Sequence, residues 1–204
     1  MRSRGFTLSE VLAVIVIIAM LSALLWPVGT QAKQSAQGTV CLSNLYQIGA
    51  STSLYCADHD DHYPVCVNAV ERRVPELRFG RDKTDDPAKF PTPVEVLMPY
   101  VKSAGPFVCS LDLGTAVGRS GFTAYPRLSK FNGGTSYFFA ELFEQQTTTS
   151  WRNPANAIWA CDGGLAWHSP DYREMDPDSY QITAVAYDGH AKVFKHRNAP
   201  TFHE

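Results

Sequence analysis

A long apolar segment dominates the start of the chain. Between Val11 and Trp26 the only polar residue is Ser22, and the segment extends back to residue 6. As a helix rising about 1.5 Å per residue, residues 6–26 would be ~31 Å long, which matches the ~30 Å hydrocarbon core of a bilayer. Two arginines precede the segment, and no cation follows it before Lys33. The positive-inside rule therefore predicts a single-pass membrane protein with a cytoplasmic N-terminus and its bulk outside the cytoplasm.

A second helical pattern follows the apolar segment. Gln31–Asp58 is polar, but Cys41, Leu45, Ile48 and Tyr55 recur at steps of three, four and seven, which places them on one helical face. We therefore predict one long helix, with residues 6–28 in the membrane and residues 29–60 forming an amphipathic half that packs along a soluble domain. Three glycines in the second half lower its helix propensity, so kinks are expected there.

The C-terminal third carries the pattern of a small sheet. Ile182–Tyr187 is rich in β-branched and aromatic residues, His190–Lys195 alternates, and Asp188-Gly189 lies between them. An Asp-Gly pair between two such runs predicts a β-hairpin with a two-residue turn, in which both turn residues have positive φ. Ala157–Cys161 predicts a third strand.

The middle of the chain has no clear period. Val70–Pro99 contains many prolines and charged residues, which predicts a long loop with little regular structure. Residues 61–204 are expected to form an extracytoplasmic α+β domain that ends in the hairpin. The predicted fold class is thus α+β, a long N-terminal helix packed on a small antiparallel sheet.

Composition excludes several classes of protein. The 204 residues are 45% hydrophobic and 19% charged, a globular mix that excludes a wholly disordered chain. The formal net charge is -2, and there is no basic stripe of the kind that sequence-independent nucleic-acid binding requires, so no nucleic-acid partner is expected. The nucleophile-elbow, zinc-protease, P-loop and dinucleotide-binding motifs do not occur in the sequence, so we do not expect an enzyme.

The boundary between the basic start and the apolar segment resembles the prepilin processing site of type IV pilins and type II secretion pseudopilins; it reads Arg4-Gly-Phe-Thr-Leu-Ser-Glu-Val11. The resemblance implies that residues 1–5 are a leader, that a prepilin peptidase/methyltransferase cuts after Gly5, and that Phe6 becomes the N-methylated first residue. Glu10 is then fifth in the mature chain, where the family keeps its intramembrane carboxylate. Pro27 falls where many members carry a helix-softening proline.

Physical chemistry fits these roles. A carboxylate in lipid costs ~2.5–3.5 kcal/mol, and the new amine of Phe6 would also be costly there. If Glu10 of one subunit faces the Phe6 amine of a neighbour, each charge offsets the desolvation of the other. Pro27 lacks an N–H and would loosen the helix. There are two alternatives. One is a secretory signal, but the small-residue cleavage site of such a signal is absent here. The other is a plain membrane anchor, which does not explain the presence of Glu10.

Further segments resemble a pilin-like subfamily with a C-terminal H-x9-DG processing-associated domain. They read Cys41-Leu-Ser-Asn-Leu-Tyr-Gln-Ile-Gly49, Phe107-Val-Cys109 and Tyr187-Asp-Gly-His190, and with the processing site they span residues 5–195. The subfamily's His, ten residues before the Asp, is replaced here by Asp178. The resemblance implies a long-range pair between Cys41 and Cys109.

The cysteines suit an oxidising compartment, because everything beyond the membrane is expected outside the cytoplasm. Cys56 and Cys66, ten residues apart across a predicted turn, form a second candidate disulfide beside Cys41 and Cys109. The sequence leaves the connectivity open.

The densest group of metal-ligating residues is Asp58-His59-Asp60-Asp61-His62. On a helical turn His59 and His62 could share a face and bind zinc or nickel. Asp60 and Asp61, with loop carbonyls, could instead hold calcium. The alternative is a polar turn that ends the long helix.

These observations favour a filament subunit, a pilin or pseudopilin in the bacterial inner membrane. Its expected partners are the prepilin peptidase/methyltransferase, other subunits, an inner-membrane assembly platform and the lipid bilayer. The alternative is a membrane-tethered protein that uses the prepilin pathway without polymerising and binds a carbohydrate or a metal. An exposed aromatic patch would serve such binding, with candidates Trp151, Trp159, Trp167, Tyr125, Tyr137 and Tyr172.

Overall fold

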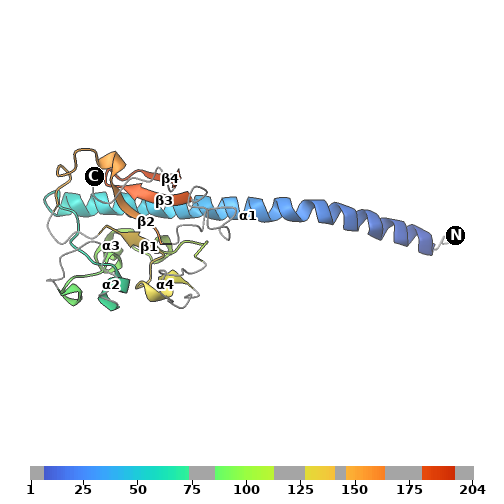
Figure 1. Cartoon of the computed structure of the whole chain (residues 1–204), viewed down its shortest axis with the longest axis horizontal. Coiled ribbons are helices and arrows are strands. Elements are labelled where there is room, and N and C mark those ends of the chain that lie inside the picture. Colours follow the sequence, from blue (N-terminus) through green and yellow to red (C-terminus); the bar gives the residue numbers. More distant parts are fainter. Residues whose placement is uncertain (1–6, 74–85, 113–126, 141–145, 164–180, 196–204) are drawn as a thin grey trace. The chain divides into compact units, whose positions relative to one another are not determined.

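The computed structural model describes residues 7–73, 86–112, 127–140, 146–163 and 181–195. The chain divides into two compact units, Met1–Ala36 and Gln37–Glu204. One helix, α1 (Leu8–Asp58), contributes to both units (Figure 1). The single long helix predicted from the sequence is therefore confirmed, and its glycines do not interrupt it.

Short helices connect α1 to the sheet, and one of the sequence predictions fails among them. The long loop predicted for Val70–Pro99 is wrong at both ends, where the structure has helices α2 and α3 (Figure 1). The short helices are α2 (Ala69–Arg73), η2 (Pro87–Lys89), α3 (Pro93–Val101), η3 (Gly105–Phe107), α4 (Leu128–Phe131) and η4 (Pro154–Asn156).

Helix α3 forms because the residues before it make a capping box. The Thr92 hydroxyl accepts a hydrogen bond from the Glu95 N–H at 3.3 Å, and the Glu95 carboxylate accepts one from the Thr92 N–H at 2.6 Å. Pro93 occupies the first turn, where its missing N–H costs nothing. The helix ends at Lys102, which adopts a left-handed φ of 61°. The proline and the charged residue that predicted a loop are thus parts of a helix start.

The sheet has four antiparallel strands in the order β1-β2-β3-β4 (Figure 1). They are β1 (Tyr137–Phe139), β2 (Ile158–Asp162), β3 (Gln181–Ala186) and β4 (Ala191–Lys195). The predicted hairpin is the β3–β4 pair, and the predicted third strand is β2, so both are confirmed. Strand β1 was not predicted, because three residues are too few to show the alternation of a strand.

The turn of the hairpin differs from the prediction. Ala186 donates to the carbonyl of His190 at 2.9 Å, so three residues rather than two form the loop. Gly189 has a φ of +86°, whereas Asp188 is not among the described residues with positive φ. The Gly189 N–H bonds the carbonyl of Ala186 at 2.9 Å. This is a turn followed by a left-handed glycine, the usual form of a three-residue hairpin loop.

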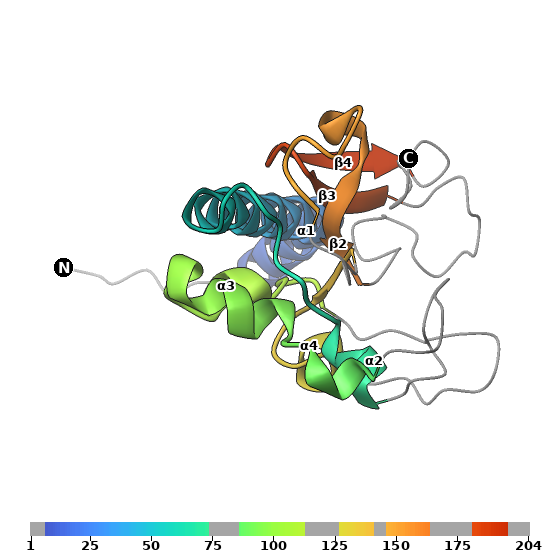
Figure 2. The ribbon, with the colours of Figure 1, turned by 90° about the vertical axis from the view of Figure 1, so that its left-hand side faces the viewer.

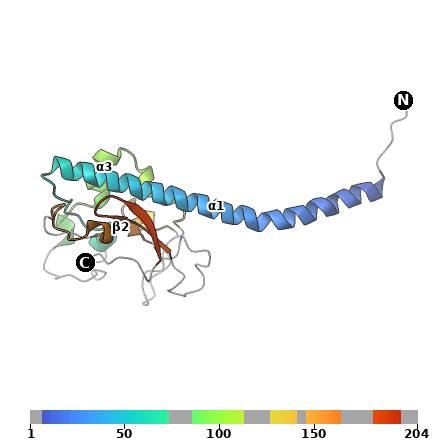
Figure 3. The same cartoon turned by 90° about the horizontal axis from the view of Figure 1, so that it is seen from above.

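The core of the second unit lies between α1 and one face of the sheet (Figures 2 and 3). On α1, the predicted residues Cys41, Leu45 and Ile48 are fully buried, and Tyr55 is half-buried. The facing side chains of the sheet include Tyr137, Phe139, Trp159 and Val185. The opposite face of the sheet carries a separate buried cluster of Ile158, Cys161, Ile182 and Ala184.

The aromatic residues with described positions do not form an exposed patch. Trp159 and Tyr137 belong to the core. Trp151 is half-buried and stacks on Tyr187, with ring centroids 4.1 Å apart. The Trp159 indole N–H donates to the Thr52 hydroxyl at 2.9 Å, so this side chain serves the packing of α1. The other candidates, Trp167, Tyr125 and Tyr172, lie outside the described residues.

Two asparagine side chains cover the outer edge of β1. The Asn68 amide donates to the Phe139 carbonyl at 2.9 Å and accepts from the Phe139 N–H at 3.0 Å. The Asn132 amide donates to the Tyr137 carbonyl at 2.9 Å and accepts from the Val70 N–H at 3.1 Å. Both side chains are buried. They replace the backbone partners that an edge strand lacks.

A disulfide joins α1 to the segment after α3. Cys41 and Cys109 are bonded, at a sequence separation of 68. Next to this bond, the Asn44 amide donates to the Val108 carbonyl at 3.0 Å.

The alternative pair, Cys56 with Cys66, does not form, and both residues are buried thiols. After α1 the chain pairs with a distant segment, because the Tyr63 N–H bonds the carbonyl of Gln146 at 2.8 Å and His62 pairs with Thr147.

Candidate functional site

The start of α1 is the first candidate site. Gly5 and Phe6 lie outside the described residues, which begin at Thr7. One oxygen of the Glu10 carboxylate, Oε2, accepts hydrogen bonds from the Thr7 N–H at 2.8 Å and from the Thr7 hydroxyl at 2.7 Å. The Glu10 N–H lies 3.4 Å from the Thr7 hydroxyl oxygen. Thr7 and Glu10 thus form a capping box at the first turn.

A role for Glu10 was predicted from the sequence, but its partner Thr7 was not. The signal was present, because a Thr followed three residues later by Glu, directly before an apolar run, is the pattern of a capping box. The box fixes the carboxylate at the positive end of the helix dipole. It does not cancel the negative charge, which still needs a cation wherever the segment is in lipid.

The surface of α1 in the first unit is apolar and exposed. Within the described part of the chain, α1 is the one helix long and apolar enough to cross a membrane. Leu8 is 82% exposed and Trp26 is 78% exposed. The other large exposed side chains of this stretch are Val11, Leu12, Val14, Ile15, Val16, Ile17, Ile18, Met20, Leu21, Leu24, Leu25 and Val28. A patch of this size calls for lipid or for other apolar helices as its surroundings.

Glu10 is the one charged residue in this stretch, since no other Asp, Glu, Lys or Arg occurs between residue 7 and Lys33. Pro27 lies inside α1, and the helix continues through its position. The helix is not interrupted at Pro27 in this structure. The loosening expected there stays a prediction for the assembled filament.

The side chains of the Asp58–His62 group do not converge as a set of metal ligands in the structure. Among the described residues, no three His, Cys, Asp or Glu side chains converge as ligands. The His59 ring stacks on Tyr55 with centroids 3.8 Å apart, and its Nδ1 donates to the Tyr55 carbonyl at 2.8 Å. His62 Nδ1 bonds the carbonyl of His59 at 3.2 Å.

The turn geometry explains why these ligands are not brought together. Asp60 and Asp61 both adopt left-handed φ values, of 51° and 59°. The Asp61 N–H bonds the Cys56 carbonyl at 2.9 Å, which closes the last turn of α1. The structure therefore has a polar turn that ends the helix, which is one of the two possibilities considered from the sequence, and binding of zinc, nickel or calcium by these residues stays a prediction.

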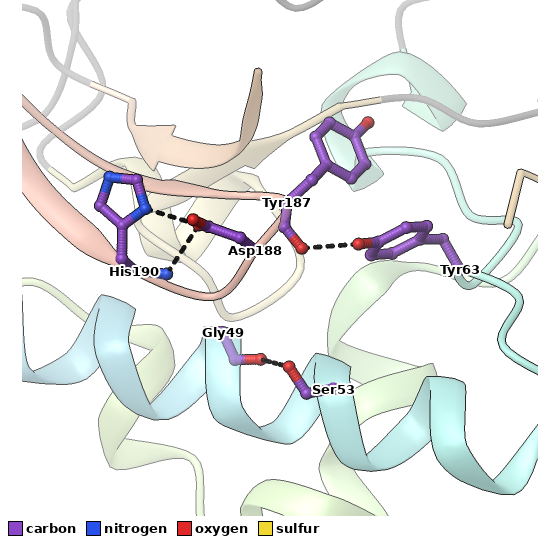
Figure 4. Close-up of polar contacts among 6 residues, drawn as sticks. All are labelled: Gly49, Ser53, Tyr63, Tyr187, Asp188 and His190. Atoms are coloured by element: carbon purple, nitrogen blue, oxygen red, sulfur yellow. Dashed lines mark hydrogen bonds and ion pairs between the residues drawn. The ribbon is translucent and has the colours of Figure 1, made fainter. Parts of the chain in front are cut away.

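The Asp188-Gly189 turn lies beside the second half of α1 (Figure 4). The Asp188 carboxylate accepts from the His190 N–H at 3.1 Å and contacts His190 Nδ1 at 2.5 Å. The segments that resemble the H-x9-DG subfamily are thus brought together, because Cys41 bonds Cys109 and Gly49 contacts the turn. Asp178, which replaces the subfamily's His, lies outside the described residues.

Comparison with known proteins identifies the N-terminal segment. Residues 1–26 match the family model described as the prokaryotic N-terminal methylation motif. No curated protein and no solved structure matches the chain. The motif supports a pilin-like protein of the prepilin pathway, of the type IV pilin or pseudopilin kind, and the α+β architecture of a long N-terminal helix on a four-stranded antiparallel sheet agrees with it.

The same match bears on partners and location. A prepilin motif implies processing by prepilin peptidase and pilin subunits as partners. Together with the apolar helix, it is consistent with a single-pass protein anchored in the inner membrane. The match ends at residue 26, so the H-x9-DG resemblance of the C-terminal part stays a prediction.

Proposed function

We propose that this protein is a structural subunit, a pilin or pseudopilin, of a type IV pilus or a type II secretion filament. One observation carries the proposal: the methylation motif of residues 1–26 coincides with the exposed apolar stretch of α1, in which Glu10 is the one carboxylate. A filament subunit needs all three features, whereas a plain anchor has no use for the carboxylate. The motif also supports a structural role rather than an enzymatic one.

In this proposal the chain is made as an inner-membrane precursor. Residues 1–5 stay in the cytoplasm and are removed by cleavage after Gly5, and Phe6 is then methylated at its new amine. Residues 6–28 span the membrane, residues 29–60 form the packed half of the helix, and residues 61–204 lie outside the cytoplasm. An inner-membrane assembly platform then extracts the mature chain into the filament.

Glu10 sets the register between subunits in this mechanism. Its carboxylate is held at the first turn by Thr7, at 2.7 and 2.8 Å. The amine of Phe6 from a neighbouring subunit would supply the missing positive charge, and the two charges would offset each other's desolvation in lipid. Pro27, which cannot donate a backbone hydrogen bond, would let the helix loosen as subunits are packed.

The test is Glu10→Ala in the full chain, expressed in its native membrane. We expect normal cleavage after Gly5 but at least about a tenfold loss of sheared filaments and of crosslinked ladders, because a charge pair in lipid is lost. Ser9→Ala is the matched control, a neighbouring polar residue without charge, and it should assemble as the wild type does.

Wild-type filament yield from Glu10→Ala would contradict the proposed register. Wild-type protein that is processed but gives no ladders would instead favour the tethered binding protein.

A further inference from the structure

The hairpin turn rests directly on the backbone of α1. A methyl group placed on Gly49 would lie 2.6 Å from Val185 Cγ2 and 2.8 Å from the Gly189 carbonyl oxygen. Atoms do not approach so closely, so only glycine at position 49 permits this contact. Figure 4 shows the Asp188-Gly189 turn facing α1 at Gly49 and Ser53. Helix and hairpin therefore meet with no side chain of residue 49 between them.

The turn is built to keep that shape. Gly189 adopts a φ of +86°, which a residue with a side chain rarely adopts. Asp188 Oδ1 accepts the His190 N–H at 3.1 Å and contacts the His190 ring, so one carboxylate makes two contacts with the residue that follows Gly189. Ser53 donates its hydroxyl to the Gly49 carbonyl at 3.1 Å, which keeps the Ser53 hydroxyl on its own helix.

A second contact ties the hairpin to the chain that leaves α1. The Tyr63 hydroxyl donates to the Tyr187 carbonyl at 2.5 Å, and the two rings pack edge to face with centroids 4.8 Å apart (Figure 4). The Tyr187 N–H in turn bonds the Ala157 carbonyl at 3.0 Å, next to β2. The residues before and within the turn are thus anchored on two sides.

We infer that the Asp188-Gly189 turn is a latch that fastens the last part of α1, residues 49–58, to the sheet. The disulfide at Cys41 holds the helix eight residues earlier, about 12 Å along its axis. The latch and the Trp159–Thr52 hydrogen bond hold residues 49–58 of α1 against the sheet. The Asp-Gly pair thereby has a conformational role, and this role does not depend on the filament proposal.

The latch predicts local opening rather than general destabilisation. In Gly189→Ala, the turn must adopt a strained φ, and in Gly49→Ala it must move off the helix. Amide hydrogen exchange in the full chain in detergent micelles should therefore rise roughly 5–30-fold in residues 49–58 and at the Asp188-Gly189 turn. Residues 41–45, beside the disulfide, should change less than about twofold, as is typical of a separate opening unit.

The chain supplies a matched control for each variant. Gly134→Ala places a side chain at a φ of +95° with no atom within 4 Å, so it imposes the strain without the contact. Gly29→Ala is a glycine replacement inside α1, also with no atom within 4 Å. Neither should change exchange in residues 49–58. An equal rise in all protected amides, no rise at all, or the same rise in the controls would overturn the latch.

A milder variant covers the case in which the alanine variants do not fold. Asp188→Ala removes the carboxylate that holds the loop, and its side chain is 35% exposed, so the core is untouched. The Cys56 thiol, on α1 and 2% exposed, reports on opening through its rate of alkylation, and Cys161, in the separate cluster on the other sheet face, is the internal reference. We expect Cys56 to react at least about fivefold faster with Cys161 unchanged. Equal acceleration of both thiols, or none, would overturn the inference.

Discussion

Removing the disulfide between Cys41 and Cys109 should strongly destabilise the folded chain. The bond closes a loop across 68 residues. The chain-entropy relation for a loop of that length gives about 4 kcal/mol of stabilisation, because the unfolded chain loses freedom when it is crosslinked. Both sulfurs are buried, so replacing them also removes packing.

The perturbation is the double variant Cys41→Ala with Cys109→Ala, measured as the full chain in detergent micelles. We expect the midpoint of thermal unfolding, followed by far-UV circular dichroism, to fall by about 8–16 °C. Cys56→Ala is the matched control, because it removes a buried sulfur from the same helix without removing a crosslink. Its midpoint should fall by no more than about a third as much.

Reduction of the wild-type protein should reproduce the loss of the double variant without any change in side-chain volume. A shift of about 3 °C in the unfolding midpoint corresponds to roughly 1 kcal/mol of stability. If the double variant and the reduced wild type both unfold within that interval of the oxidised protein, the loop-closure reasoning is wrong.

Two further changes test the sheet. Burial raises the pKa of Asp162 to about 8 from 3.8, so the folded chain keeps this carboxyl neutral and loses stability as the pH rises from about 4 to 8. Asp162→Asn, neutral at every pH, should raise the unfolding midpoint by at least ~3 °C at pH 7.5 and by less at pH 4.5; an equal shift at both values would contradict this. Asn68→Ala should cost about 2–4 kcal/mol in urea unfolding, since it leaves the buried N–H and carbonyl of Phe139 without partners. A cost below ~1 kcal/mol would show that the edge of β1 does not need Asn68.

Features with local causes could be predicted from the sequence. The long apolar run and the spacing of Cys41, Leu45 and Ile48 each depend on a helix period within a few turns, and α1 follows from them. The hairpin was predictable for the same reason, because its two strands and its glycine are adjacent in the chain. Its loop length was not, since pairing of Ala186 with His190 depends on how the strands align.

Features with distant causes were missed or left open. Strand β1 is three residues long, and its outer edge is paired by Asn68 and Asn132 from elsewhere in the chain. Helix α3 has a local cause, the capping box of Thr92 and Glu95, but it was missed. The prediction of a loop counted prolines and charged residues and did not consider their spacing. The pairing of Cys41 with Cys109 follows from the packing of α1 on the segment after α3. The spacing of cysteines in a sequence does not determine which of them pair.

The proposed cut after Gly5 precedes Thr7, the first residue that the structure describes. The motif match over residues 1–26 covers the stretch of α1 whose large apolar side chains are exposed. Thr7 and Glu10 close the first turn of that helix directly after the proposed cut.

The most direct test of the account is the mass of the mature protein, isolated from its native membrane and analysed by intact and N-terminal peptide mass spectrometry. The account predicts a chain that begins at Phe6 and carries one added methyl group on its amine. A chain that still begins at Met1, or one cut near Thr30, would contradict the prepilin pathway and remove the role proposed for Glu10.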